Sequence, residues 1–165
     1  MEYSIKIPEK YVRLLRKNNE KLKKHFEKIT GVKLNIRGNE IMYATDDPVL
    51  GFALQRVLRA FGRGFSMDDA LNLLDDEYGL EIIDITAFSG RSKNRLRELK
   101  GRVIGRDGKA KRTIENLTNT KIAVSGKTVS ILGKWEDVYR ARHAIEMLLQ
   151  GAMHKTVYRW LETVG

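Results

Sequence analysis

The residues with the clearest chemical meaning form a short turn with a glycine at each end. Residues 103–111 read Val-Ile-Gly-Arg-Asp-Gly-Lys-Ala-Lys, so that Gly105 and Gly108 enclose Arg106 and Asp107. Neither glycine carries a Cβ, and a sugar-phosphate chain can therefore lie directly against the backbone of such a turn. A helix that starts after the turn adds unpaired N–H groups and the positive end of its dipole. The pattern indicates a site that binds a phosphodiester backbone.

The segments around this turn predict the elements that must hold it. Apolar residues on one face predict a helix over 109–119, and alternating residues predict a hairpin of strands 121–125 and 128–132. Another amphipathic helix follows over 138–148, and the isoleucine-rich stretch 81–88 is expected to form an opening strand. Gly-x-x-Gly alone also occurs where one helix ends and another begins. The order strand, helix, turn, helix, strand, strand, helix is more specific, because it is typical of type I KH domains, which grip single-stranded RNA through this loop.

Composition and charge agree with a soluble protein that binds nucleic acid. The chain has 165 residues, 42% hydrophobic and 32% charged, which predicts one globular domain or two small ones. Its net charge is +10, and segment 91–112 contains ten Lys or Arg residues against two acidic ones, whereas segment 66–85 contains seven acidic residues and no cation. A concentrated basic block around the glycine turn is the electrostatic footprint of nucleic-acid binding.

Other features limit where the protein works. There is no cysteine, which excludes disulfides and thiolate metal sites and favours an intracellular location. No apolar run has the length of a membrane span, and the amino-terminal residues lack the apolar core of a signal peptide. We therefore expect a cytoplasmic protein that does not bind membranes.

The chain repeats itself with an offset of 88 residues. Residues 29–34 (Ile-Thr-Gly-Val-Lys-Leu) align with residues 117–122 (Leu-Thr-Asn-Thr-Lys-Ile), and Gly38 then falls on Gly126. The repeat predicts an α+β protein with two tandem type I KH domains, each a three-stranded sheet with helices packed on one face. The expected domains are residues 1–77 and residues 78–165, and the second ends in an amphipathic helix around 153–161.

The two repeats differ at the turn itself. Opposite the glycine turn of the second repeat, the first repeat has Lys17-Asn18-Asn19-Glu20, with side chains at both glycine positions and a carboxylate at one of them. Close approach of a phosphate is harder there. We therefore expect the first domain to be a scaffold or an auxiliary basic surface, and a solvated, solubilising face is an equal alternative.

In the second domain, three kinds of group are expected to hold the RNA. The turn backbone and the cations after it would anchor phosphates, Ile104 and Ile122 would form an apolar floor, and the strand over 122–124 would read base edges. The two isoleucines are alternatively core residues, and Asp107 is alternatively a cap of the following helix. The expected RNA-binding residues are Arg102, Ile104, Gly105, Arg106, Asp107, Gly108, Lys109, Lys111, Arg112, Lys121 and Ile122.

These motifs together resemble a known family. The stretch from Leu99 to Leu161, with Ile-Leu-Gly-Lys-Trp at 131–135 and Gly-Ala-Met-His-Lys-Thr-Val-Tyr at 151–158, is similar to the Partner-of-Nob family, also called Dim-two or Krr-like. Residues 65–74 match the helix that follows the first KH unit there. The family consists of KH-domain factors for assembly of the small ribosomal subunit, and the resemblance covers nearly the whole chain.

The resemblance implies a ligand and partners. It implies binding to single-stranded small-subunit rRNA near its 3′ end, and partnership with the endonuclease that matures that end. It also implies a link with the alpha subunit of translation initiation factor two, and the short form of the chain suggests an archaeal protein. By position it assigns RNA contact to the turn 105–108 and to Lys109, Lys111 and Arg112.

Two other classes of function remain as alternatives. For an enzyme, the candidates are His25, His143 and His154, none of which has metal-ligand spacing, and the acidic run 75–77, whose carboxylates need not face one point. The Gly-x-x-x-x-Gly-Lys-Ser/Thr loop of nucleotide-binding proteins is absent. We therefore expect no catalytic residue, metal or cofactor. The remaining alternatives are a protein-docking adaptor and a general binder of single-stranded nucleic acid, DNA included, in translation or RNA decay.

Overall fold

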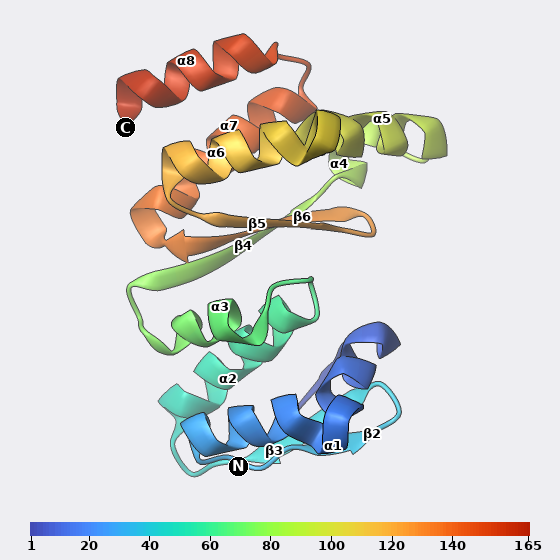
Figure 1. Ribbon diagram of the computed structural model, residues 1–165, viewed down its shortest axis with the longest axis vertical. Helices are drawn as coiled ribbons and strands as arrows, with labels where there is room; N and C mark the ends of the chain where they lie inside the picture. The colour runs from blue at the N-terminus through green and yellow to red at the C-terminus, as the bar shows by residue number, and fades with distance from the viewer. The chain divides into compact units, whose positions relative to one another are not determined.

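The computed structural model describes residues 1–165 as two compact α+β units, Met1–Asp76 and Glu77–Gly165 (Figure 1). Each unit contains one three-stranded antiparallel sheet together with helices. The boundary between the two units lies between Asp76 and Glu77. None of the helices is both long enough and apolar enough to cross a bilayer.

Unit 1 is built around a long helix that is interrupted in the middle. Three consecutive residues of α1, Asn18, Asn19 and Glu20, have positive φ of 55°, 56° and 60°, so α1 is two helices joined by a turn at the position predicted by the repeat. The sheet order is β1-β3-β2. The elements are β1 (Glu2–Lys6), α1 (Glu9–Thr30), β2 (Asn35–Arg37), β3 (Glu40–Ala44), α2 (Pro48–Phe61), α3 (Met67–Leu71) and the 3-10 turn η1 (Asn72–Leu74).

Local signals in the sequence explain where the helices of unit 1 begin and end. The carboxylate of Asp47 accepts hydrogen bonds from the N–H groups of Val49 (3.0 Å) and Leu50 (3.3 Å), which caps α2 next to a proline at its first position. Ser66 caps α3 in the same way. At the other end of α1, Gly31 takes the left-handed conformation that ends a helix.

Unit 2 has the same order of strands and helices around the glycine turn. Its sheet order is β4-β6-β5, and α5, α6 and α7 lie on one face of this sheet (Figure 1). The elements are β4 (Tyr78–Asp84), α4 (Thr86–Ser89), α5 (Lys93–Ile104), the 3-10 turn η2 (Arg106–Gly108), α6 (Lys109–Thr118), β5 (Lys121–Ser125), β6 (Thr128–Lys134), α7 (Trp135–Leu149) and α8 (His154–Val164).

The opening strand of unit 2 differs from the expectation over 81–88. β4 starts at Tyr78 and ends at Asp84, because the Asp84 carboxylate accepts hydrogen bonds from both the N–H (2.9 Å) and the hydroxyl (2.6 Å) of Thr86. These bonds turn the chain into the short helix α4 and hold the pKa of Asp84 below its usual range. Alternation of apolar residues predicted the strand but not this turn.

A single apolar core holds the glycine turn of unit 2 in place. Leu99 and Val103 of α5, Ile114 of α6 and Ile131 of β6 are fully buried in it. Val157 and Leu161 of α8 join the same core, which explains why this terminal helix is amphipathic. The helices on both sides of the turn are therefore fixed by packing, and the turn itself projects from a rigid base.

The repeat also appears as a repeated hydrogen bond. In unit 2, Oε2 of Glu115 accepts a 2.8 Å bond from the N–H of Ile122 on β5, and in unit 1 Oε2 of Glu27 accepts a 2.8 Å bond from the N–H of Leu34. Each glutamate also pairs with a lysine four residues earlier, at 3.5 Å in unit 2 and 3.3 Å in unit 1. The two units thus share a specific bond between the second half of the broken helix pair and the following strand.

Loss of this carboxylate is expected to weaken unit 2. We expect Glu115→Ala to lower the free energy of unfolding by about 1–3 kcal/mol, because the N–H of Ile122 loses its acceptor. Urea unfolding followed by tryptophan fluorescence reports on this unit, because both tryptophans, Trp135 and Trp160, lie in it. The matched control is Glu162→Ala at an exposed position of α8; an equal effect of the two substitutions would contradict the assigned role of Glu115.

Candidate nucleic-acid interface

The glycine turn joins α5 to α6 at the surface of unit 2. The turn consists of Gly105 and the short 3-10 segment η2, and Gly105, Asp107 and Gly108 all have positive φ, of 75°, 54° and 75°. Arg106 and Asp107 are exposed, and so is Lys109 at the start of α6. The structure therefore presents the backbone between the two helices to solvent.

The two glycines are required for different reasons. A Cβ on Gly105 would lie 2.6 Å from the Cβ and 2.7 Å from the N of Ala110, so the first turn of α6 packs directly on this residue. A Cβ on Gly108 would meet only the flexible end of Arg112, with Nη1 at 2.9 Å. Gly105 thus allows the turn to close, and Gly108 keeps the surface of the turn free of side chains.

The cations of the turn are only partly engaged inside the protein. Arg106 and Lys109 make no ion pair and no side-chain hydrogen bond, so both are free to meet a phosphate. Nη1 of Arg112 donates a 2.7 Å hydrogen bond to the carbonyl of Asp107, which fixes the turn and leaves the rest of the guanidinium available. Lys111 pairs with Glu115 at 3.5 Å.

The start of α6 offers backbone donors as well. Gly108 is the N-cap residue and no side chain caps the helix, so the alternative role of Asp107 as a cap is wrong. The N–H groups of the first turn of α6 are left without a side-chain acceptor. These donors and the positive end of the helix dipole favour an anion at this position.

Three of the residues expected to bind RNA have other roles or positions. Arg102 donates hydrogen bonds to the carbonyl oxygens of Leu148 (3.0 Å) and Ala152, which ties α5 to the end of α7. Ile122 is 3% exposed and belongs to the core, which favours its alternative role as a core residue. Lys121 is exposed but follows α6, whose 10 residues separate it from the turn by about 15 Å. Ile104, at the end of α5, remains half-exposed beside the turn.

The edge of the sheet provides groups that can read bases. β5 pairs with β6 on one side only, so its other side is open. Because the N–H of Ile122 points to Glu115 and away from β6, the backbone groups of alternate residues, including Val124, face the open side. A carbonyl and an N–H at this edge can bond the Watson–Crick edge of an unpaired base.

A feature that the sequence analysis missed lies on α5. Gly101 is exposed, no atom lies within 4 Å of a Cβ built on it, and it precedes Gly105 by one helical turn. Gly101 therefore leaves the surface of α5 next to the turn without a side chain. A glycine inside a helix lowers its stability by up to about 1 kcal/mol relative to alanine. A glycine at position 101, inside the helix expected before the turn, was therefore a signal in the sequence for a functional position.

No group of three or more His, Asp or Glu side chains is arranged to hold a metal ion. The acidic run 75–77, which was considered for an enzyme, is exposed at the boundary of the two units. His154 uses Nε2 in a 2.7 Å hydrogen bond with the carbonyl of Arg102, and His25 pairs with Asp68 at 3.0 Å. The strongest concentration of functional groups is therefore the turn of unit 2.

Comparisons with known proteins give a consistent result. Residues 79–165 match the family model for a eukaryotic-type KH domain (KH-domain type I), the second KH domain of PNO1 proteins. A KH domain-containing protein of Methanocaldococcus jannaschii is 45% identical over 96% of this chain and 71% of its own length. The pre-rRNA-processing protein PNO1 of Phaeosphaeria nodorum is 35% identical over 81% of this chain, which spans only about half (53%) of that protein.

Solved structures extend the similarity to the whole chain. The crystal structure of Dim2p from Pyrococcus horikoshii is 34% identical and superposes with a TM-score of 0.89, covering 99% of both chains. A chain in the crystal structure of the a/eIF2alpha-aDim2p-rRNA complex from the same organism gives a TM-score of 0.88 at 34% identity, covering 99% of this chain and 93% of that one.

Proposed function

The chain belongs to the PNO1/Dim2 family of KH-domain proteins, and from this premise we propose that its second unit holds single-stranded small-subunit rRNA near the 3′ end during ribosome biogenesis. The family is the one that the motifs of residues 99–161 predicted, in its archaeal form. The observation that carries the proposal is the exposed glycine turn between α5 and α6, with Arg106 and Lys109 unpaired beside it.

The proposed mode of binding uses each group according to its chemistry. The backbone of the turn, the first N–H groups of α6, Arg106, Lys109 and part of Arg112 hold phosphates, which gives affinity without sequence choice. The surface at Gly101, which has no side chain, lets the strand pass close to α5, beside Ile104. The open edge of β5 reads the bases, and this requires an unpaired strand because pairing hides their edges. The proposed contacts do not include Arg102, Lys121 or the side chain of Ile122.

We further propose that both units are KH domains in tandem. This rests on the shared order of elements, on the matching sheet orders and on the repeated bond of Glu27 and Glu115 to the next strand. In unit 1 the turn carries side chains at Lys17, Asn18 and Glu20. RNA contact is therefore assigned to unit 2.

The proposal includes partners and a location. The related chain from Pyrococcus horikoshii was crystallised in a complex with a/eIF2alpha and rRNA, which supports the alpha subunit of initiation factor two as a partner here. The endonuclease that matures the 3′ end of the small-subunit rRNA is proposed from the family alone. A cytoplasmic location is proposed with them, because the family's related proteins process pre-rRNA or are bound to rRNA and a/eIF2alpha.

Salt dependence tests the proposed phosphate clamp. We expect the affinity for a labelled single-stranded RNA with the 3′-terminal sequence of the small-subunit rRNA to fall as salt is raised. In the double variant Arg106→Gln/Lys109→Gln, the slope of log K against log salt should be about 1.4 smaller, since two phosphate contacts are lost. Fluorescence anisotropy at several salt concentrations measures both slopes.

The control for this test is Lys134→Gln, at the last residue of β6. This end of β6 pairs with the start of β5, which follows the end of α6 that lies away from the glycine turn. This variant should keep both the slope and the affinity. A duplex RNA of the same sequence should bind more weakly than the single strand, and single-stranded DNA tests the more general alternative. An equal loss in the control variant, or a preference for the duplex, would contradict the proposal.

A further inference from the structure

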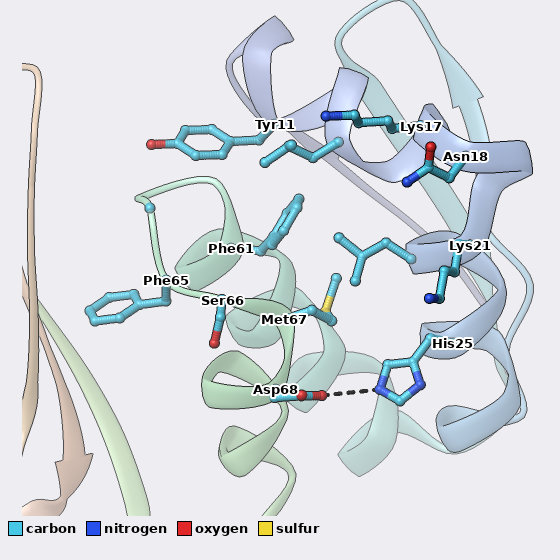
Figure 2. Close-up of a pocket in the computed structure, with 13 residues that line it drawn as sticks. Tyr11, Lys17, Asn18, Lys21, His25, Phe61, Phe65, Ser66, Met67 and Asp68 are labelled. Carbon is cyan, nitrogen blue, oxygen red and sulfur yellow. Dashed lines mark hydrogen bonds and ion pairs between the residues drawn. The ribbon is translucent and has the colours of Figure 1, made fainter.

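Unit 1 contains an open pocket of about 610 Å³ that the RNA-binding proposal does not use (Figure 2). The pocket lies between α1 and the segment that follows α2. Apolar side chains form most of it: Tyr11 and Leu14 come from the first half of α1, Phe61 from the end of α2, and Met67 from α3. Leu14 is 44% exposed although it faces this apolar surface.

The rim of the pocket is positively charged on the side of α1. Figure 2 shows Lys17, Asn18 and Lys21 projecting from α1 beside the pocket. Neither lysine has an ion-pair partner. The only carboxylate of the lining is Asp68, and it already pairs with His25 at 3.0 Å. The pocket thus combines an apolar floor with unpaired cations on one edge.

The repeat shows what covers the same surface in unit 2. With the offset of 88 residues, Tyr11, Leu14 and His25 correspond to Leu99, Arg102 and Thr113. In unit 2, α8 and the turn that precedes it contact the elements that carry these positions. Leu99 is fully buried in the core that Val157 and Leu161 of α8 join. Arg102 donates to the carbonyl of Ala152 and its own carbonyl bonds His154 at the start of α8, and α6, which carries Thr113, packs against α8.

Unit 1 has only a partial substitute for this covering helix. α8 has 11 residues and buries Val157 and Leu161, whereas α3 has five residues and reaches α1 through the pair of Asp68 with His25. The part of α1 around Leu14 and Lys17 stays uncovered. Unit 1 therefore lacks the element that closes the same surface in unit 2.

We propose that this pocket is a docking site for an amphipathic helix of a protein partner, with acidic residues beside its apolar face. The helical form follows from α8, which occupies the corresponding surface of unit 2. The acidic flank follows from Lys17 and Lys21, which would pair with carboxylates across the rim and orient the helix. Apolar side chains of the helix would cover Leu14 and the ring of Tyr11.

The test uses a synthetic peptide as the probe, with the full-length protein and no RNA. The peptide has the 11-residue length of α8, apolar residues at the spacing of one helical face, and glutamates on both flanks of that face. A second peptide has the same apolar residues with lysines in place of the glutamates. Amide chemical shifts in NMR spectra locate binding, and a titration measures affinity.

We expect the acidic peptide to shift the amides that line the pocket and the lysine peptide to leave them unchanged. Lys17→Glu/Lys21→Glu should weaken the acidic peptide at least about tenfold, and Leu14→Asp should weaken it as well. The matched control is Lys127→Glu in the β5–β6 turn of unit 2, which should have no effect. RNA binding by unit 2 is measured separately, so failure of one proposal does not count against the other.

Four results would overturn the proposal. The first two are an acidic peptide that leaves the pocket amides unshifted, and one that binds the double variant as tightly as the natural protein. The third is a single-stranded RNA that shifts the pocket amides and loses affinity in the double variant, which would make the pocket part of a nucleic-acid surface. The fourth is a dimer in sedimentation that Leu14→Asp dissociates, in which case a second copy of the chain is the occupant.

Discussion

Gly108→Asp is expected to leave the protein folded and to lower its affinity for single-stranded RNA about 100-fold, which corresponds to ~2.8 kcal/mol. The backbone of Gly108, with φ of 75° and ψ of 11°, is left-handed, a conformation that aspartate tolerates better than most residues. The new Cβ meets only the movable end of Arg112. Its carboxylate, however, lies where a phosphate is expected to sit, and like charges at such a contact cost several kcal/mol.

The measurement is anisotropy with the single-stranded RNA, together with circular dichroism as a test of folding. The matched control is Gly31→Asp at the end of α1, because Gly31 has nearly the same backbone angles (72° and 8°) and open space around its Cβ position. That variant should bind RNA like the natural protein. Unchanged binding by a folded Gly108→Asp protein would remove the glycine turn from the proposed interface and favour the protein-docking alternative.

The second prediction concerns stability. Gly105→Ala is expected to lower the free energy of unfolding of unit 2 by roughly 2–4 kcal/mol. The angles of Gly105, φ 75° and ψ 174°, are almost inaccessible to residues with a side chain. The added methyl group would also lie within 3 Å of Ala110, at both its Cβ and its N. The turn and the start of α6 must then move apart.

Urea unfolding with tryptophan fluorescence measures this loss in unit 2. The control is Gly101→Ala, which lies in regular helix with open space around it and should raise stability by up to about 1 kcal/mol. The same control has a second use, because a methyl group on the bare surface at Gly101 should weaken RNA binding while the protein becomes more stable. If both alanine variants had the same stability, the packing role assigned to Gly105 would be wrong.

Local patterns in the sequence predicted the elements of unit 2 well. The helix expected over 109–119 is α6, and the hairpin expected after it is β5 with β6, because these elements have a clear apolar period. The break in α1 at Lys17–Glu20 was predicted by the repeat, since no glycine marks it. The family was also predicted correctly from the combination of motifs.

Arg102, Ile122 and the bounds of β4 depart from the local reading of the sequence for a common physical reason. Arg102 was assigned to RNA because it lies in a basic block, but its long side chain reaches carbonyl groups 46 and 50 residues later in the chain. Ile122 was expected to contact bases, but one face of the outer strand that carries it packs against the apolar core. The shift of β4 came from a bond between Asp84 and Thr86 that hydropathy does not reveal. Specific side-chain hydrogen bonds and packing between distant residues decide these roles. The pattern of apolar and charged residues in a single sequence does not show such contacts.

The bonds of Glu27 and Glu115 to the neighbouring strands have a consequence for solubility. An outer strand with a free row of N–H and carbonyl groups invites another chain to extend the sheet, which is a common start of aggregation. Glu115 occupies one donor of β5, and Glu27 occupies the N–H of Leu34 directly before β2, so each places a carboxylate beside an outer strand. An approaching strand would find that donor already bonded and would meet a charged group. The protein can therefore keep a short length of open edge for its ligand and still resist stacking with its own copies.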